Sequence, residues 1–474
     1  MDLDPVFLSR LQFVWVVALH ILLPAFTVGL ASFIALLESL HLLTKNPVYL
    51  RLSRFWLRIF AVSFGLGVVS GIVMPFQFGT NWSRFSDATA NVVAPLLAYE
   101  GLTAFFLEAA FLGVLLFGRQ LVPPIVHCGA AILVALGTFF STFWILAVNS
   151  WMQTPAGYEQ VDGRFFPADW MALIFNPSLP YRLAHTVTAF FLTTAFVVIA
   201  VASYHLRKPQ FVPESRAMLS MTLWLATVLV PAQVLIGDLH GLNTLEHQPT
   251  KVAAMEANWD RRGAAPLLLF ALPDQAGEHN RLEVGIPYFG SLILRHSLDG
   301  EIPGLKEVPA EDRPPVAVVF WAFRVMVGAG FAMLGIVCVG LWLRLRHALY
   351  TTPWFQWLCL ASAPLGFIAV LAGWTVTETG RQPWVVYGLM RTRDAVSPSI
   401  TGLDVALSLA VYVVVYTFVF GAGLILLLRL MRTIPSPHEE PRITAPPDQP
   451  ADSVALLGGQ RPLAAGTGAG GAGS

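Results

Sequence analysis

The sequence predicts an all-α integral membrane protein, a bundle of about nine transmembrane helices. Of its 474 residues, 55% are hydrophobic and only 12% are charged, whereas about a quarter of the residues in a typical globular domain are charged. Several apolar runs are long enough to cross a hydrocarbon core about 30 Å thick. These runs are continuously apolar and do not alternate with polar residues, which excludes a transmembrane β-barrel.

Each predicted span is an apolar run that ends in a polar connector, and the connectors give the orientation. The short connectors after the first, third, fifth, seventh and ninth runs carry Lys and Arg, which favour the cytoplasmic side. The two longest connectors, 150–182 and 239–315, carry mixed charge and are expected outside. The N-terminus is therefore predicted outside and the C-terminus in the cytoplasm. The expected spans are 14–42, 55–79, 93–117, 124–149, 183–204, 217–237, 316–343, 355–376 and 404–428.

The two ends of the chain differ in character. The first ten residues are acidic where a signal peptide would be basic, so we expect the first span to stay in the mature protein. Residues 1–433 are predicted to form one transmembrane domain. The rest of the chain is rich in Pro, Gly and Ala, so residues 434–474 are expected to be a disordered cytoplasmic tail. A net charge of zero gives no reason to expect a nucleic-acid partner.

Cysteines and histidines limit the kinds of metal centre to expect. Of the eleven histidines, only His20, His127 and His185 are expected within spans or at their edges, and the others are expected in connectors, at span ends or in the tail. A haem–copper oxidase would need several more histidines in its spans. The cysteines have no CxxC spacing and are expected to be small buried residues and not metal ligands. They are Cys128, Cys338 and Cys359.

Two carboxylates interrupt the third predicted span. Glu100 and Glu108 lie in an otherwise apolar stretch, and a charge at bilayer depth is costly and usually functional. Eight residues of regular α-helix rise about 12 Å and turn about 80° beyond two full turns, so both carboxyls can face one side of a bundle. The pair indicates a proton relay or a cofactor site. The alternative is that each is a protonated side chain in a helix contact.

Further candidate ligands fall in the outer half of other spans. His20, His185, Met326 and Glu378 are all placed there by the predicted topology. Histidine with methionine is a known axial pair for an electron-transferring haem. For a single histidine in a span, the alternative is an ordinary packing contact.

Two arginines accompany these residues. Arg324 precedes Met326 by two positions, which places it roughly on the opposite face of the helix. Arg381 follows Glu378 by three positions. Each is expected either to neutralise a haem propionate or to pair with an acid.

The outer connector 239–315 contains a second group of candidates. A short helix is expected after Pro249, and it would carry Lys251 and Glu256. Loops of this length in a compact protein are usually functional. Lys251 and Glu256 are candidates to bind and deprotonate a quinol head group, and the alternative is a solvated amphipathic helix.

Six stretches, spread from the first span to the eighth, carry a family resemblance. They are Gln12-Phe13 through His20 and Pro24, Phe76-Gln77-Phe78-Gly79-Thr80-Asn81-Trp82, Glu100-Gly101 through Phe105-Phe106-Leu107-Glu108, Trp144-Ile145-Leu146 through Trp151-Met152-Gln153, Phe323-Arg324-Val325-Met326, and Gly380-Arg381-Gln382-Pro383-Trp384. With these stretches, the chain resembles subunit I of the cytochrome bd-type quinol oxidases. The last stretch is highly specific, and only the tail and much of the outer loop are not covered. That loop is of the short kind found in the family.

The resemblance implies a role for each candidate residue. His185 and Met326 would bind a low-spin haem b, and His20 and Glu378 would ligate two high-spin haems in an order that differs among family members. Glu100 would lie beside an oxygen-site iron, either as its ligand or close to it, and Glu108 on the proton route toward it. Trp374 would be an aromatic residue beside a haem. Lys251 and Glu256 match quinol-loop positions.

The resemblance also implies the reaction and its setting. Residues 1–433 would bind two haems b and one haem d, or a third haem b in its place. The protein would oxidise ubiquinol or menaquinol and reduce dioxygen to water, forming a proton gradient without a pump. It would lie in the bacterial cytoplasmic membrane with subunit II and, in some complexes, small single-span subunits. The rival functions are a proton-coupled transporter and a non-catalytic haem-bearing anchor of another respiratory complex.

Overall fold

The structure is a computed structural model that describes residues 4–208 and 211–434. Within these residues, nine helical stretches are long and apolar enough to cross a membrane, which confirms the predicted fold class. The predicted tail, 434–474, lies outside the described residues except for Ile434. Six of the spans are single helices with apolar interiors: α1 (Pro5–Thr44), α2 (Pro47–Thr80), α5 (Pro124–Gln153), α7 (Leu179–His205), α8 (Val212–His247) and α14 (Gly402–Arg432).

Three spans contain an irregularity or a short added segment. The third span is α3 (Ser83–Glu100), a π-helical segment (Gly101–Phe105) and α4 (Phe106–Phe117), with a 3₁₀ turn at Gly118–Gln120. The seventh is α11 (Val316–Leu345), which the 3₁₀ turn Ala310–Asp312 precedes. The eighth consists of α12 (Pro353–Ala361) and α13 (Leu365–Thr379). The predicted regular α-helix between Glu100 and Glu108 is therefore wrong, because a π-helical turn lies between them.

The helices are longer than the apolar runs that predicted them. The first helix begins at Pro5, where the Asp4 side chain caps it by accepting a hydrogen bond from the Val6 amide at 2.9 Å. It ends at Thr44, and Lys45 takes a left-handed conformation. Asn46 then caps α2 through the Val48 amide at 3.0 Å. Apolar length marks only the part of a helix inside the hydrocarbon, so the polar end turns were missed.

The longer helices also change two sequence predictions. The eighth helix continues to His247, so the first part of the predicted loop 239–315 is helical. His41 and His205 lie in the last turns of α1 and α7, at span ends as expected, whereas His240 and His247 were expected in the connector and lie in α8 instead. Cys128 and Cys359 are buried as predicted, but Cys338 is exposed because it lies on the outward face of α11.

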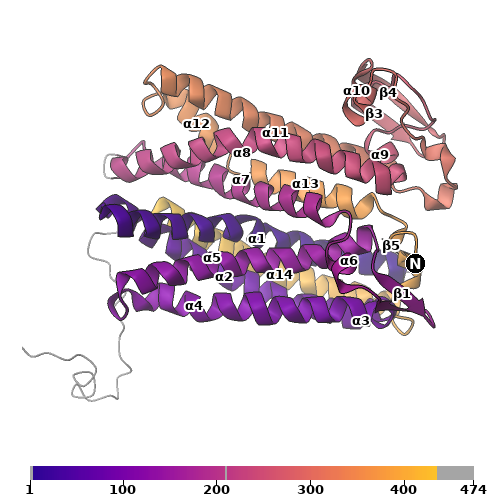
Figure 1. Ribbon diagram of the computed structural model, residues 1–474, viewed down its shortest axis with the longest axis horizontal. Coiled ribbons are helices and arrows are strands. Elements are labelled where there is room, and N and C mark those ends of the chain that lie inside the picture. The colour runs from indigo at the N-terminus through magenta and orange to yellow at the C-terminus, as the bar shows by residue number, and fades with distance from the viewer. Residues whose placement is uncertain (1–3, 209–210, 435–474) are drawn as a thin grey trace, which may run out of the picture. The chain divides into compact units, whose positions relative to one another are not determined.

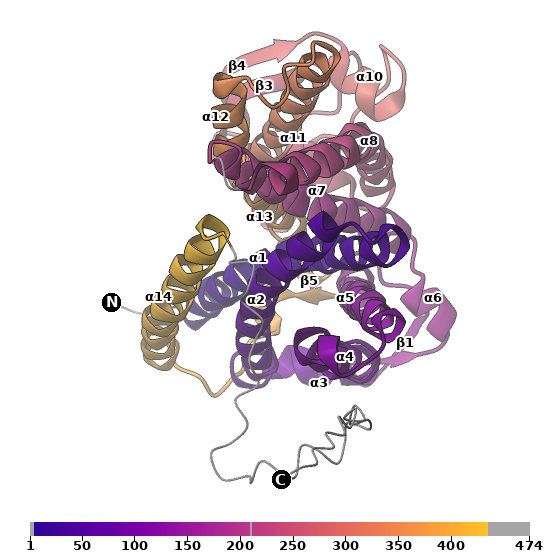
Figure 2. The ribbon, with the colours of Figure 1, turned by 90° about the vertical axis from the view of Figure 1, so that its left-hand side faces the viewer.

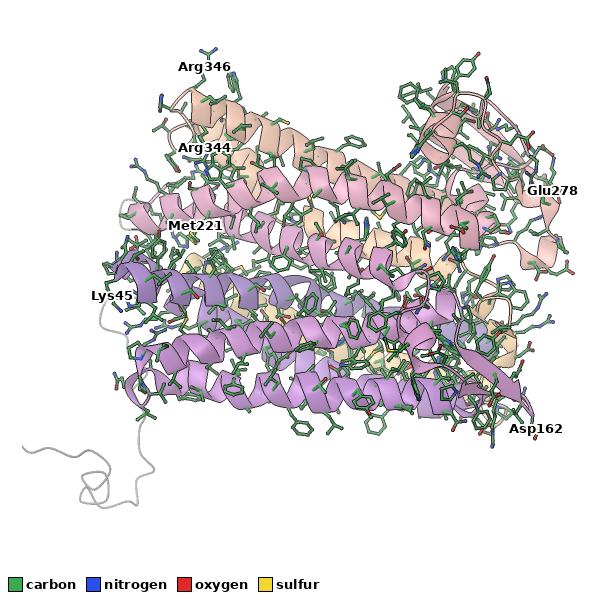
Figure 3. The ribbon with its side chains drawn as sticks, viewed as in Figure 1. Lys45, Asp162, Met221, Glu278, Arg344 and Arg346 are labelled. Atoms are coloured by element: carbon green, nitrogen blue, oxygen red, sulfur yellow. The ribbon has the colours of Figure 1, made fainter. Side chains whose placement is uncertain are left out.

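The bundle has two chemically different ends (Figures 1 and 3). Figure 3 shows Lys45, Arg344 and Arg346 at one end, here called the basic end, and Asp162 and Glu278 at the other, here called the loop end. Short elements gather at the loop end: β1 (Tyr158–Val161) with β2 (Arg164–Pro167), α6 (Trp170–Ile174), α9 (Pro249–Met255), β3 (Leu267–Asp274) with β4 (His279–Ile286), α10 (Phe289–Arg295), and β5 (Trp384–Val386) with β6 (Met390–Arg391). Each strand pair is an antiparallel hairpin.

Packing around α1 and α7 organises the spans. The first helix packs against α2, α5, α7 and α14, and α7 packs against α8, α12 and α13, as the end-on view in Figure 2 shows. The largest apolar cluster fills the bundle toward the basic end, where buried Trp56, Phe60, Phe196 and Phe355 interlock. Because lipid tails are as apolar as these side chains, van der Waals packing between the helices stabilises this part of the bundle, and not the removal of apolar surface from water. A polar network around Glu378, near the end of α13 that leads into β5, lies toward the loop end instead (Figure 1).

Candidate functional site

Three candidate ligands each face a glycine on a neighbouring helix. A Cβ atom built on Gly71 of α2 would lie 3.3 Å from Cε1 of His20. One on Gly237 of α8 would lie 3.4 Å from Cε1 of His185, and one on Gly373 of α13 would lie 2.9 Å from the sulfur of Met326. A larger residue at Gly373 would displace the Met326 side chain, whereas at Gly71 and Gly237 a Cβ atom would only touch the histidine ring.

The two histidines present free nitrogens. The Nδ1 atom of His20 lies 2.9 Å from the Ser70 hydroxyl, which fixes the ring and leaves Nε2 for another partner. A metal-ligating histidine is commonly oriented in this way through its other nitrogen. Nδ1 of His185 is buried and has no hydrogen-bond partner among the described residues. The His185 ring contacts the ring of His240, with centroids 5.4 Å apart.

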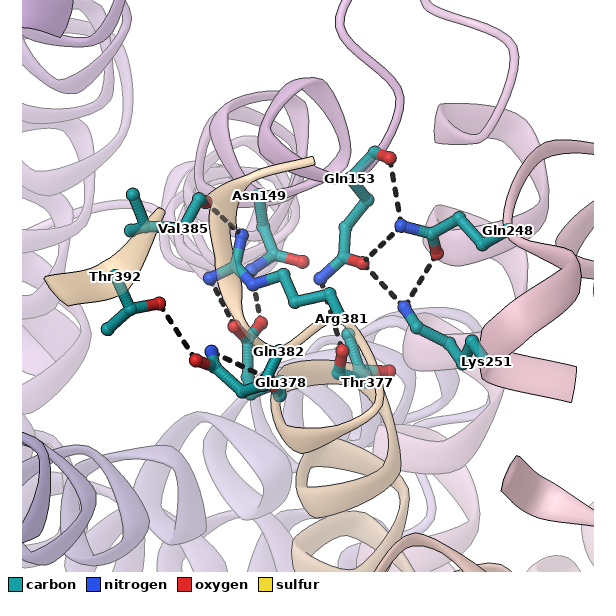
Figure 4. A network of polar contacts seen from close by, with 10 residues as sticks. All are labelled: Asn149, Gln153, Gln248, Lys251, Thr377, Glu378, Arg381, Gln382, Val385 and Thr392. Atoms are coloured by element: carbon teal, nitrogen blue, oxygen red, sulfur yellow. Dashed lines mark hydrogen bonds and ion pairs between the residues drawn. The ribbon is translucent and has the colours of Figure 1, made fainter. Parts of the chain in front are cut away.

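Glu378 lies at the end of α13 in a network of polar contacts (Figure 4). One carboxylate oxygen accepts a hydrogen bond from Asn149 at 2.7 Å, and the other pairs with Arg381. Nη1 of Arg381 also donates to the Val385 carbonyl at 2.8 Å. Arg381 was expected either to neutralise a haem propionate or to pair with an acid. In the structure it pairs with an acid, Glu378. Its Nε atom has no partner among the described residues, and neither has Nε of Arg182, which is buried nearby on α7.

Lys251 is buried in the same network and not in contact with solvent. Its ammonium donates to the side-chain oxygens of Gln153 and Gln248, each at 2.6 Å. Gln153 in turn donates to the backbone carbonyl of Thr377 at 3.3 Å, beside Glu378 (Figure 4). Burial, reinforced by the positive charge of Arg182, holds the pKa of Lys251 well below its ordinary value, although the charge of Glu378 opposes that shift.

Glu256 and Arg324 form a separate ion pair at the junction of the loop and α11. Nη2 of Arg324 lies 2.7 Å from Glu256, and the other two nitrogens donate to the carbonyls of Met255 at 2.6 Å and Leu268 at 2.8 Å. Arg324 therefore pairs with an acid, which was the second alternative for it. Met326, two residues on, faces α13 instead, in line with the predicted opposite faces.

The two acids of the third span both face α5. Glu100 accepts a hydrogen bond from Ser141 at 2.7 Å. Glu108 lies against Gly137, where a Cβ atom would come within 2.6 Å of its Cγ. One oxygen of Glu108 is buried without a partner among the described residues. The π-helical turn between the two acids is a feature that often marks a functional site.

Sequence reasoning missed several residues of these networks. Asn149 and Gln153 are four residues apart on one face of α5, and they link the Glu378 and Lys251 contacts. In the sequence, Gln153 was noticeable only as part of a stretch that carries the family resemblance. Nothing in the sequence marked Arg182 and His240 as functional, because each is a single polar residue near the end of a predicted span. Trp374 is partly buried on α13, next to the Gly373 that faces Met326.

The side chains of His20, His185 and Met326 have the chemistry that a haem site requires. Imidazole and thioether groups are the usual axial ligands of haem iron, and the glycines leave room beside them. The unpartnered nitrogens of His185, Arg182 and Arg381 are buried donors or acceptors that an additional group would satisfy.

If Met326 ligates a haem, Gly373→Val should weaken that haem site. A Cβ atom at this position would already lie 2.9 Å from the sulfur, so valine must displace the side chain. The low-spin signal in a reduced-minus-oxidised visible spectrum should broaden or disappear. Gly330→Val on α11 is the matched control, because nothing lies within 4 Å of a Cβ atom there. An unchanged low-spin spectrum in Gly373→Val would remove Met326 from the site.

Comparison with known proteins points to one family. A family model described as cytochrome bd terminal oxidase subunit I matches residues 8–435. The chain is 36% identical to the cytochrome bd ubiquinol oxidase subunit 1 of Bacillus subtilis, with 89% of this chain and 92% of that protein covered. It is 31% identical to the cytochrome bd-II ubiquinol oxidase subunit 1 of Escherichia coli, covering 91% and 97% respectively. Its fold matches the bd oxidase from Geobacillus thermodenitrificans with a TM-score of 0.85, at 31% identity over 92% of this chain and all of that one.

Proposed function

Because the chain belongs to the cytochrome bd terminal oxidase subunit I family, we propose that its buried polar networks hold its haems and conduct its protons. The chain is a subunit of a multi-pass bacterial membrane oxidase that takes electrons from quinol and delivers them to dioxygen. It binds haem and works in a complex with subunit II. Its polar side chains divide the reaction among haem sites, a quinol site and a proton route.

The low-spin haem b is assigned to His185 and Met326. The observation that carries this assignment is that each of these side chains faces a glycine, Gly237 and Gly373, in the group of helices α7, α8, α11 and α13. Thioether ligation favours the reduced iron and suits electron transfer. When bound, the haems would supply one-electron transfer, and the high-spin haems would supply the binding of dioxygen. The buried guanidinium groups of Arg182 and Arg381 are proposed to neutralise haem propionates through their unpartnered Nε atoms, while Arg381 keeps its ion pair with Glu378.

The two high-spin haems, a second haem b and a haem d or a third haem b, are assigned to His20 and Glu378. Ser70 orients the His20 ring, and Asn149 with Arg381 orients the Glu378 carboxylate. Such outer contacts fix the direction of a ligand and tune its basicity. Glu100, hydrogen-bonded to Ser141, is the carboxylate beside this site, and Trp374 is an aromatic wall of a haem pocket.

Lys251 is the group proposed to receive a quinol proton. Two of its three N–H donors are held by the neutral amides of Gln153 and Gln248, so its ammonium is not paired with a carboxylate. Its lowered pKa makes the neutral amine, a proton acceptor, accessible. Glu256 is held by Arg324 at the root of the loop, where it is proposed to bind the second quinol hydroxyl. The donor is a membrane quinol, ubiquinol or menaquinol.

We place the basic end in the cytoplasm and the loop end outside the cytoplasmic membrane. Lys45, Arg344 and Arg346 at the basic end support this orientation. Quinol protons then leave outside, whereas protons for water formation enter from inside through Glu108, so a gradient forms without a pump. Small single-span subunits are further proposed partners.

A reduced-minus-oxidised visible spectrum of the purified complex, repeated with carbon monoxide, tests the haem assignment. We expect one low-spin haem that does not bind the gas and two high-spin haems of which at least one does. A single low-spin haem without a gas-binding species would indicate a non-catalytic haem anchor. A colourless protein would indicate a transporter.

We expect the quinol kcat/KM to rise with pH through the lowered pKa of Lys251. Raising the pH removes a proton from the buried ammonium and so creates the acceptor, and the depressed pKa moves this rise to a lower pH than for a free lysine. Lys251→Arg should abolish the rise, because a guanidinium stays protonated. Steady-state quinol oxidation across pH is the measurement. Lys306→Arg, an exposed loop lysine paired with Asp260 at 3.0 Å, should keep the wild-type profile. An unaltered pH profile in Lys251→Arg would exclude Lys251 as the acceptor.

A further inference from the structure

A further buried carboxylate lies toward the basic end, away from the candidate haem ligands. Glu38 of α1 is only 3% exposed. One of its oxygens accepts hydrogen bonds from Ser53 of α2 and from Arg119 in the turn after α4. Its other oxygen faces His127 of α5. Four segments of the chain therefore meet at one acid, inside the part of the bundle that is otherwise filled by apolar side chains.

The contacts of His127 decide how many protons its ring carries. The ring is 2% exposed, and its Nε2 atom lies 3.1 Å from the backbone carbonyl of Leu115. A carbonyl only accepts, so Nε2 must carry a hydrogen. In a neutral ring Nδ1 would then be a bare lone pair, 3.4 Å from the Glu38 carboxylate and without a hydrogen-bond partner among the described residues. Two acceptors facing each other in a buried site repel, and a proton between them removes the repulsion.

We propose that Glu38 and His127 hold a stored proton between them and form the uptake pair of the proton route that leads to Glu108. The proton resides either on Nδ1, giving imidazolium beside carboxylate, or on the Glu38 oxygen, giving carboxylic acid beside neutral imidazole. In both forms the pair has one proton more than a neutral histidine beside a carboxylate. Arg119 keeps the carboxylate in place and adds one positive charge to the group.

The pair is attached to the helices that carry the rest of the route. His127 contacts Leu115 on α4, which also carries Glu108, and α5 carries both His127 and the Ser141 that binds Glu100. The boundary between the third span and α5 therefore carries His127, Glu108 and Glu100 in order from the basic end to the loop end. Leu115 lies seven residues beyond Glu108, about 10 Å along the helix. A short chain of waters covers such a distance. This inference rests on the proposed function, because the route it feeds is the one assigned to Glu108.

The test combines infrared spectroscopy with turnover in the complete oxidase complex. Histidine labelled with ¹³C in its ring should show an imidazolium band that is lost in His127→Asn and in Glu38→Gln, or else a carboxylic acid band that is lost in Glu38→Gln. In the same variants, quinol-driven oxygen consumption should fall at least tenfold, while anaerobic reduction of the low-spin haem by quinol stays fast. Haem content, measured in the same samples, establishes that each variant is assembled.

His205 offers a matched control. It is also fully buried, its Nε2 lies 2.7 Å from the Met431 carbonyl, and its Nδ1 lacks a partner among the described residues. Aromatic rings of Phe55 and Phe211 lie beside it, and no carboxylate contact to it is present among the described side chains. His205→Asn should therefore leave both the infrared bands and turnover near those of the wild type.

The outcomes separate the stored proton from its function. Absence of both bands in the wild-type protein would overturn the stored proton. Bands that behave as expected, together with normal turnover in His127→Asn and Glu38→Gln, would overturn the route. Because the bands are read in the resting protein, they remain informative if Glu108 itself is found not to conduct protons.

Discussion

Replacement of His185 with alanine is expected to remove the low-spin haem and to lower quinol-driven oxygen reduction on the order of 100-fold or more. Loss of a direct iron ligand should exceed the 10–100-fold effects that are typical when only an outer contact of a metal site is lost. The side chain faces Gly237, and its Nδ1 has no partner among the described residues, so no other contact of that nitrogen would be lost. The reduced-minus-oxidised spectrum should lack the low-spin bands and keep the gas-binding species.

His205→Ala on the same helix is the control for His185→Ala. His205 is equally buried but lies near the opposite end of α7, where it contacts the Met431 carbonyl. Its replacement should leave the low-spin bands intact. Added imidazole, which can occupy the space left in His185→Ala, should restore part of the low-spin signal. A full low-spin spectrum in His185→Ala without imidazole would show that another residue binds this iron.

Replacement of Glu108 with leucine is expected to slow oxygen reduction about 100-fold, in the range that loss of a positioned proton-transfer group usually produces. Glu108 is 7% exposed, and one of its oxygens is buried without a partner among the described residues, so this oxygen can bind a water molecule and is not held in an ion pair. Leucine conserves volume against Gly137 but transfers no proton. Stopped-flow measurements should show normal quinol reduction of the low-spin haem followed by slow reoxidation by dioxygen.

Two further variants separate proton transfer from packing at this position. Glu108→Gln keeps the polar shape and should be as slow as Glu108→Leu, whereas Glu108→Asp should recover part of the rate. Glu214→Gln is the control for loss of a buried acid, because Glu214 is 3% exposed but is paired with Arg51 at 2.5 Å. It should turn over nearly as fast as the wild type. Normal reoxidation in Glu108→Leu would contradict the relay.

The sequence predicted the helices well because a bilayer imposes their length. Each apolar run had to be about 20 residues long, and this requirement can be read without tertiary contacts. This length requirement does not apply to the polar turns at helix ends. The predicted sixth span therefore stopped before His240 and His247, although α8 continues to His247. The π-helical turn after Glu100 was also missed, since nothing in its five residues, Gly101–Phe105, excludes a regular α-helix.

The candidate site could be predicted only where a residue type is itself unusual. A glutamate in an apolar run, such as Glu108, attracts notice by its cost. By contrast, Gln153 and Lys251 are close only because α5 and α9 meet at the loop end, and a contact over 98 positions leaves no periodic pattern. Glu38 and His127 are likewise joined over 89 positions by the packing of α1 against α5. The sequence left open whether Arg324 neutralises a haem propionate or pairs with an acid. Only the position of Glu256 in the fold shows that it pairs with an acid.

The apolar cluster toward the basic end has an electrical consequence. In the proposed orientation, it occupies the cytoplasmic part of the bundle, where side chains such as Trp56 and Phe196 exclude water. A layer of low polarisability behaves as the insulator of a capacitor, so much of the membrane voltage falls across it. Moving one elementary charge through the whole voltage costs about 2.3 kcal/mol per 100 mV. The packing that stabilises these helices would thereby also set how much of each proton's passage is converted into stored charge.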